Sequence, residues 1–215
     1  MTTYSEWQAS RFNTGDPTTT KTCQDCHFAD GRHGALRADD VKQAARLEIL
    51  PSAAATPGKE LELRVRVSNV GAGHDLPTGA AELRQMWLAL TVTDAAGREV
   101  FASGKTNEYG YPVEGTTIYG TAWQDATGHS TDRLWEAASP LRDRRIPAGG
   151  AAMEIYRFVL PADVRGPQHV RAALNYRAAT GYLTALMTIY LGAEVAPAPV
   201  IELAETWASV SVKTR

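Results

Sequence analysis

Polar and apolar side chains alternate along much of the chain after about residue 45. The segment 60–69 (ELELRVRVSN) places Leu61, Leu63, Val65 and Val67 on one side and charged residues on the other. A period of two residues is typical of a β-strand with one buried face and one solvated face. The pattern therefore predicts a half-buried strand over 60–69.

Several later segments have the same character. The stretch QMWLALTVTDAAGREVFASG predicts two strands that are joined by a turn containing an Asp and a Gly. The C-terminal PVIELAETWASVSV predicts one or two more strands. The first two of these strands are expected at about 85–93 and 98–103, and two further strands are expected at about 153–160 and 168–178. About seven short strands separated by turns favour a mainly β fold, an immunoglobulin-like antiparallel β-sandwich over 46–215.

Two parts of the chain lack this alternation. Residues 1–45 are polar and rich in turns, with helical stretches near 3–11 and 36–46. A segment of this size cannot bury a core alone, so we expect it to pack on the sandwich. Residues 105–150 hold many Gly, Thr, Tyr and Trp residues without a clear period, and they predict a long irregular insertion. The segment 180–191 predicts a short helix.

The composition argues against two classes of partner. The chain has 215 residues and a formal net charge of −2, and it has no basic stripe of the kind that binds nucleic acid. No apolar run approaches the roughly 20 residues that a membrane span needs. The N-terminal residues show neither the positive region nor the apolar run of a signal peptide. We therefore expect no nucleic-acid binding and no membrane span.

Both cysteines of the chain fall within the six residues TCQDCH. Cys23 and Cys26 are directly followed by His27, and C-x-x-C-H is the signature of covalent haem c attachment. The two thiols can each add to a vinyl group at one haem edge, and the next imidazole then reaches the iron as its proximal ligand. The motif predicts that 1–45 is a haem-attachment segment that carries one haem c.

Three other interpretations of the two cysteines fit the sequence less well. A thioredoxin-like redox pair requires a preceding strand, but the polar stretch GDPTTTK precedes the motif. A zinc site requires a second pair of ligands at a suitable spacing, which the sequence does not offer. A disulfide between these cysteines would close too short a loop to stabilise the fold much.

The second axial ligand of the iron is the open question. His74 lies in NVGAGHDLPTG, where glycines allow the backbone to pass close to a large flat group. The same residue could simply form hydrogen bonds within a glycine-rich turn. His33 and His129 are further candidates for the distal position, although both suit a surface turn. His169 opens a predicted strand and is better suited to a structural role.

Three parts of the chain together resemble a known family. These are YSEWQASRFN…TCQDCH, VSNVGAGHDLPTG…ELRQMWLALTVTDAAGREVFASG, and DRRIPAGG…YRFVLP…VRAALNYR. They resemble the C-terminal portion of multihaem c-type cytochromes of the c554-like group, in which the last C-x-x-C-H haem is followed by a β-sandwich with a G-H-x-x-P-T-G loop. The resemblance implies a bis-histidine haem with His74 as the distal ligand. This chain has one C-x-x-C-H where those cytochromes have several, so it is either a single-haem relative or a domain of a longer protein.

A haem with two axial imidazoles favours electron transfer, because no substrate reaches the iron without displacing a ligand. The expected partners are redox proteins or other haem domains, and the expected location is periplasmic or extracytoplasmic, where haem c is attached. The alternatives are a haem enzyme or small-molecule sensor with an open distal site, and a binding module whose haem is structural. We also expect 105–150 to meet the haem. Aromatic residues that could pack on it are Trp7, Tyr109, Tyr111, Tyr119 and Trp123.

Overall fold

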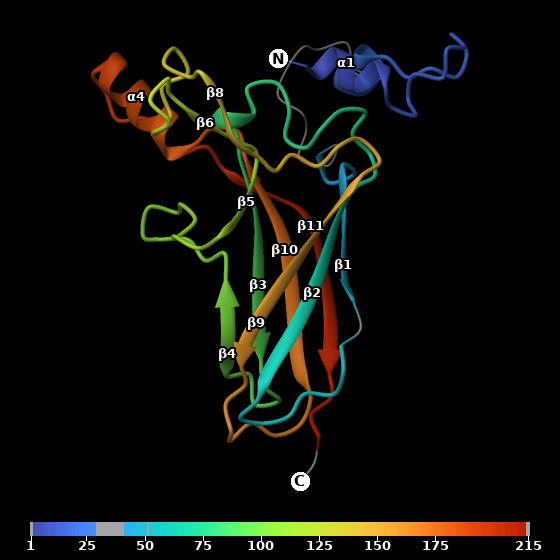
Figure 1. Ribbon diagram of the computed structural model, residues 1–215, viewed down its shortest axis with the longest axis vertical. Helices are drawn as coiled ribbons and strands as arrows, with labels where there is room; N and C mark the ends of the chain where they lie inside the picture. Colours follow the sequence, from blue (N-terminus) through green and yellow to red (C-terminus); the bar gives the residue numbers. More distant parts are fainter. Residues whose placement is uncertain (1, 29–40, 51, 214–215) are drawn as a thin grey trace.

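The computed structural model describes residues 2–28, 41–50 and 52–213. Long strands run along one direction of the molecule, and the N-terminal helix α1 (Thr3–Gln8) lies at one end of them (Figure 1). The last strand ends at the opposite end, near the C-terminus (Figure 1). No helix in these described ranges is long and apolar enough to cross a membrane.

One sheet of the sandwich consists of strands β1 (Ala45–Leu50), β2 (Glu60–Asn69) and β9 (Ala151–Val159), in the order β1-β2-β9. All its pairings are antiparallel, and Leu63 of β2 lies opposite Tyr156 of β9. The predicted strand over 60–69 is therefore confirmed at both of its ends.

The second sheet has the order β11-β10-β3-β4 and is also antiparallel. Its strands are β3 (Gln85–Thr93), β4 (Glu99–Ser103), β10 (Gln168–Arg177) and β11 (Val200–Val210), and the short β5 (Thr117–Tyr119) also pairs with β3. The expected mainly β, immunoglobulin-like antiparallel β-sandwich is confirmed.

The core lies between the two sheets and is built from alternate residues of the strands. The alternation that predicted β2 is visible in its burial, because its leucines and valines are buried while its charged side chains face outward. The facing layer comes from Met86, Leu88, Leu90, Val170 and Leu174, all of them fully buried. Burying one such side chain contributes about 1.5–3 kcal/mol, so these residues drive the pairing of the sheets.

Two helical predictions have different outcomes. Helix α4 (Gly181–Leu191) confirms the helix expected over 180–191; the Thr180 hydroxyl accepts a hydrogen bond from Leu183 N, and Gly192 ends the helix in a left-handed conformation. Of the helix expected near 36–46, positions 36–40 lie outside the described residues. Its last two positions are wrong, because the chain is already in strand β1 from Ala45.

The segment 105–150 is more ordered than its composition predicts. It contains β5 and a small three-stranded sheet with the order β7-β6-β8. The strands of this small sheet are β6 (Thr121–Gln124), β7 (Ser130–Thr131) and β8 (Ser139–Asp143), and the 3₁₀ turn η1 (Ala81–Leu83) contacts β6. It lies beside α4 at the same end of the sandwich as α1 (Figure 1).

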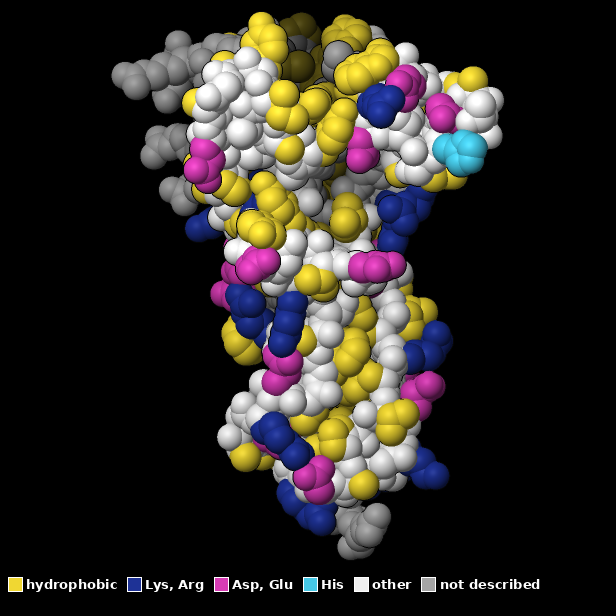
Figure 2. Space-filling view, turned by 90° about the vertical axis from the view of Figure 1, so that its left-hand side faces the viewer, with side chains coloured by type: hydrophobic (Ala, Val, Ile, Leu, Met, Phe, Trp, Pro, Cys, Tyr) yellow, Lys and Arg dark blue, Asp and Glu magenta, His cyan; other side chains and the backbone are white. Residues whose placement is uncertain are grey.

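The surface differs between the two ends of the molecule. Seen from the side of β4 and α4, hydrophobic side chains gather over the upper end, and charges of both signs are interspersed over the sandwich below (Figure 2). Several of the large exposed hydrophobic residues belong to α4 and the region of β8, among them Trp135, Leu141, Ile189 and Tyr190.

Leu63→Ala should lower the free energy of unfolding by about 2–5 kcal/mol, because it leaves a cavity at a fully buried position of β2. The matched control is Val159→Ala on the neighbouring strand β9, where the side chain is 67% exposed, and its effect should stay within about 0.5 kcal/mol. Urea unfolding followed by tryptophan fluorescence measures both. Equal effects of the two substitutions would contradict the placement of the core.

Candidate haem-binding site

The C-x-x-C-H motif forms a single helical turn, α2 (Cys23–His27). Thr22 begins the turn with reciprocal hydrogen bonds: its hydroxyl accepts from Asp25 N at 3.4 Å, and its own N–H donates to Asp25 Oδ2 at 2.7 Å. Hydrogen bonds from the backbone N–H and hydroxyl of Thr22 lower the pKa of Asp25 below its ordinary value. Residues three apart on a helix share a face, so Cys23 and Cys26 lie on one side of the turn. Both cysteines are free and exposed.

The structure brings His27 and His74 together across a wide gap in sequence. Their ring centroids lie 6.1 Å apart, and the planes of the two rings are inclined to each other by 27°. A metal–nitrogen bond is about 2 Å long, so two imidazoles that bind opposite sides of one metal have centroids roughly 6 Å apart. The spacing of the two rings therefore fits a pair of axial ligands.

The imidazole of His74 has a defined tautomer in this arrangement. Its Nδ1 lies 2.9 Å from the carbonyl oxygen of Asp75, to which a protonated Nδ1 donates. The other ring nitrogen, Nε2, is then left with its lone pair, which is the form that ligates a metal. The same hydrogen bond fixes the orientation of the ring.

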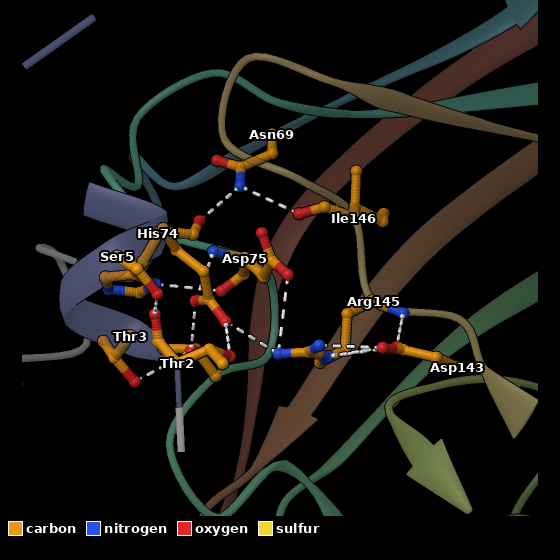
Figure 3. Close-up of polar contacts among 11 residues, drawn as sticks. Thr2, Thr3, Ser5, Asn69, His74, Asp75, Asp143, Arg145 and Ile146 are labelled. Carbon is orange, nitrogen blue, oxygen red and sulfur yellow. Dashed lines mark hydrogen bonds and ion pairs between the residues drawn. The ribbon is translucent and has the colours of Figure 1, made fainter. Parts of the chain in front are cut away.

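Asn69 holds the backbone of the loop that carries His74. This residue ends β2, and only 1% of its surface is exposed. Its Nδ2 donates to the carbonyl oxygens of His74 and Ile146, at 2.7 Å and 3.1 Å (Figure 3). Its Oδ1 accepts from Ala72 N at 3.2 Å. One buried amide thus joins the loop to the strand before it and to the segment that leads into β9.

The two glycines before His74 each allow a close approach. A side chain at Gly71 would place its Cβ only 2.0 Å from the carbonyl oxygen of Gln43. A Cβ at Gly73 would lie 3.2 Å from the ring of Phe12 and 3.3 Å from the ring of Trp7. Gly71 therefore packs on neighbouring backbone, and Gly73 packs on aromatic rings of the N-terminal segment.

A cluster of charges fastens α1 to the His74 loop. Arg145, which follows β8, donates from Nη1 to Glu6 of α1 at 2.8 Å and lies 3.4 Å from Asp75. Its Nη2 donates to Asp143 at 2.7 Å (Figure 3). Glu6 also accepts from the Thr78 hydroxyl at 2.5 Å and from Asp75 N at 3.2 Å. We call these five residues the Arg145 clamp.

The clamp affects its two partly buried carboxylates in opposite ways. Burial acts to raise the pKa of Glu6, but hydrogen bonds from Thr2, Thr78, Asp75 N and Arg145 outweigh it and lower that pKa. Burial and the nearby Glu6 carboxylate raise the pKa of Asp75 above its ordinary value. Glu6 is thus the better stabilised anion, and Asp75 depends more strongly on the positive charge of Arg145.

The predicted candidates end up in different places. Of the aromatic residues, Trp7 lies against the His74 loop, whereas Tyr119 is buried in the core, where its hydroxyl donates to Glu154. Tyr109 is exposed. Tyr111 and Trp123 line a pocket beside α4, away from His74.

The other histidine candidates and the 105–150 segment also have defined outcomes. His33 lies outside the described residues. His129 sits in the turn between β6 and β7, where its Nδ1 hydrogen-bonds the Thr127 hydroxyl at 2.8 Å. The 105–150 segment contacts the His74 loop near its end, where Ile146 exchanges backbone hydrogen bonds with Leu76 at 2.8 and 2.9 Å.

Sequence reasoning missed the residues that position the loop. Glu6 and Arg145 are far apart in the chain, and each belongs to a segment that was expected to be irregular or only briefly helical. Within the described ranges, no group of three or more His, Cys, Asp and Glu side chains is placed to hold a metal ion. A haem iron takes four ligands from its porphyrin, so it needs only two from the protein.

No protein-family model matches the chain, and no curated protein matches it. Among solved structures, the chain is similar to the penta-heme cytochrome c552 from Thermochromatium tepidum, with a TM-score of 0.65 and 19% sequence identity over 97% of this chain and 50% of that chain. The chain thus spans about half the length of that cytochrome.

Two other solved structures are more distant. They are the sporulation control protein Spo0M from Bacillus subtilis, with a TM-score of 0.35 and 11% identity over 80% of this chain and 50% of that chain, and the CARDB domain of PF1109 from Pyrococcus furiosus, with a TM-score of 0.32 and 10% identity over 79% and 86%. The likeness to the cytochrome concerns the fold alone. It confirms the expected multihaem-cytochrome-like fold, and the narrower c554-like group stays a prediction.

Proposed function

We propose that this chain binds one haem c through Cys23, Cys26, His27 and His74 and acts in electron transfer. The observation that carries the proposal is the pair of imidazoles with ring centroids 6.1 Å apart, one of which belongs to a C-x-x-C-H turn. The cytochrome-like fold supports it. The bound haem would supply a one-electron Fe(III)/Fe(II) couple.

Each protein residue has a separate task in this proposal. The exposed thiols of Cys23 and Cys26 hold one edge of the ring, and His27 is the proximal ligand. His74 would be the distal ligand, and the hydrogen bond between its Nδ1 and the Asp75 carbonyl oxygen orients the ring and leaves Nε2 for the metal. Asn69 and the Arg145 clamp act as positioning residues, because they hold the loop of His74 without reaching the iron.

Electron transfer follows from the occupation of both axial positions. His27 and His74 would each supply one imidazole to the iron, and a bound haem held in this way would supply a one-electron couple without an exchange of protein ligands. An enzyme or sensor would instead need an open or readily displaced distal site. The buried amide of Asn69 and the clamp work against displacement, because moving His74 would break the contacts of both.

The partners and the location belong to the same proposal. Redox proteins or other haem domains are the expected partners. The similar cytochrome is named as penta-heme and is about twice as long as the stretch it shares with this chain, which makes a neighbouring haem domain a natural partner. Since the thioether bonds of haem c are made outside the cytoplasmic membrane, the location is periplasmic or extracytoplasmic.

The optical spectrum of the protein, produced with a haem c maturation system, tests the proposed ligation. We expect a low-spin spectrum in both oxidation states that carbon monoxide and cyanide leave unchanged. A high-spin ferric spectrum, or rapid binding of carbon monoxide, would reject bis-histidine ligation and favour the enzyme or sensor. A protein in which the haem remains extractable by acidic organic solvent would reject covalent attachment.

His74→Ala should convert the haem from low spin to high spin and allow carbon monoxide to bind, because it removes the distal nitrogen. The matched controls are His129→Ala and His169→Ala, which should keep the low-spin spectrum. Absorption and electron paramagnetic resonance spectra measure the spin state. If His129→Ala gives the high-spin form and His74→Ala does not, the assignment of the distal ligand is wrong.

Arg145→Gln should weaken the hold on the distal ligand while leaving the ligand itself in place. It leaves Glu6, Asp75 and Asp143 without their shared positive charge, so stability should fall by about 1–3 kcal/mol and carbon monoxide should bind to a larger fraction of the protein. The control Arg157→Gln breaks an exposed ion pair with Glu62 and should cost less than about 1 kcal/mol. A loss of stability without any change in carbon monoxide binding would show that the clamp is structural only.

A further inference from the structure

Arg177 is a charged residue buried on the outer face of the second sheet. It ends β10, and only 3% of its surface is exposed. Its Nη2 donates to the carbonyl oxygen of Gly110 at 2.6 Å. Its guanidinium carbon lies 4.7 Å from the ring centroid of Tyr111 and 6.0 Å from that of Trp87. The β4–β5 loop, which supplies Gly110 and Tyr111, thus covers the side chain.

The buried guanidinium has no anionic partner among the residues that the structure describes. Its Nε and Nη1 are buried and donate to no hydrogen-bond acceptor there, and it forms no ion pair with a described residue. Arginine stays protonated at all accessible pH values, so the charge cannot be removed by titration. The two aromatic rings compensate for part of the lost hydration, but they supply no negative charge.

Arg171 on the same strand shows what a paired arginine looks like in this sheet. Its Nη2 lies 2.5 Å from Glu202 and 3.1 Å from Glu205, and its side chain is about one-third exposed. The more exposed arginine therefore has two carboxylates, and the more deeply buried one has none. Burial favours the opposite distribution, because an unpaired charge is most costly where water is excluded.

Arg177 lines an open pocket of about 470 Å³. The lining also includes the side chains of Lys105, Thr106 and Asn175, and in the described part of the chain it includes no carboxylate. Lys105 shares its charge with Glu99, 2.6 Å away, so the guanidinium is the main uncompensated charge. The pocket size lies in the range of small-molecule sites.

We propose that this pocket binds a small oxyanion, either an inorganic anion of the sulfate or phosphate class or a short organic carboxylate. Arg177 supplies the neutralising charge, and Asn175, Thr106 and Lys105 supply hydrogen-bond donors around it. The pocket shares no residue with the proposed haem site, so the inference stands or falls independently of haem binding.

The test is anion binding by the full-length protein. Sodium sulfate, phosphate, acetate and succinate are titrated at constant ionic strength against sodium chloride, by isothermal titration calorimetry and by thermal unfolding. We expect at least one oxyanion to bind saturably and to raise the unfolding temperature as mass action requires. The anion with the highest affinity shows whether the ligand is of the inorganic or of the organic class. A response to none of them beyond that to chloride would overturn the proposal.

Arg177→Met keeps much of the volume and the packing on the two rings but removes the charge. It should abolish the saturable response, whereas the control Arg171→Gln on the same strand should keep it. An unchanged response in folded Arg177→Met would overturn the proposal. If that variant does not fold, Arg177→Lys decides: it keeps the charge but loses the planar fork, so the affinity should fall at least about tenfold. An unchanged affinity in Arg177→Lys would likewise overturn it.

Discussion

The proposed site depends on one constraint, which is that two imidazoles from distant parts of the chain must face each other at a spacing of 6.1 Å. His27 lies on a short exposed turn that has little packing of its own. His74 lies in a loop without regular structure. Neither element could hold a ring rigidly by itself. Contacts with the sandwich and with α1 fix the position of the loop that carries His74.

Two kinds of contact fix the loop of His74 relative to the sandwich. The first is short-range. Asn69 at the end of β2 holds the following loop in place, because its buried amide donates hydrogen bonds to the carbonyl oxygens of His74 and Ile146. The second is long-range: Arg145 joins α1 to the loop through carboxylates that are only partly exposed. Such charges are screened less than surface pairs, so the clamp contributes more than a typical exposed ion pair.

The sequence predicted the sandwich, and the two histidines that it proposed as haem ligands lie 6.1 Å apart, but it did not predict the contacts that hold the loop of His74. Strict alternation located the strand over 60–69, since burial on one face of a sheet enforces a period of two, and the apolar run with its following turn located the strand over 85–93. The pairing of His27 with His74 came from a family resemblance, because spacing in sequence carries no information on distance across a fold. The Arg145 clamp could not be predicted, since ion pairs between distant segments leave no local pattern. The aromatic candidates of 105–150 lie in the core, on the surface or beside α4, positions that no local sequence pattern distinguishes.

Two arginines show how this fold treats buried charge at different places. Arg145 sits among three carboxylates, and the group links three segments of the chain; its role is complete within the chain. Arg177 is more deeply buried, yet it has only a carbonyl oxygen and two aromatic rings. A methionine or leucine would fill the same space on the sheet without the cost of desolvating a charge, so packing alone does not explain an arginine there. Among the residues that the structure describes, no carboxylate pairs with Arg177, and the open pocket beside it is where the proposed oxyanion would bind.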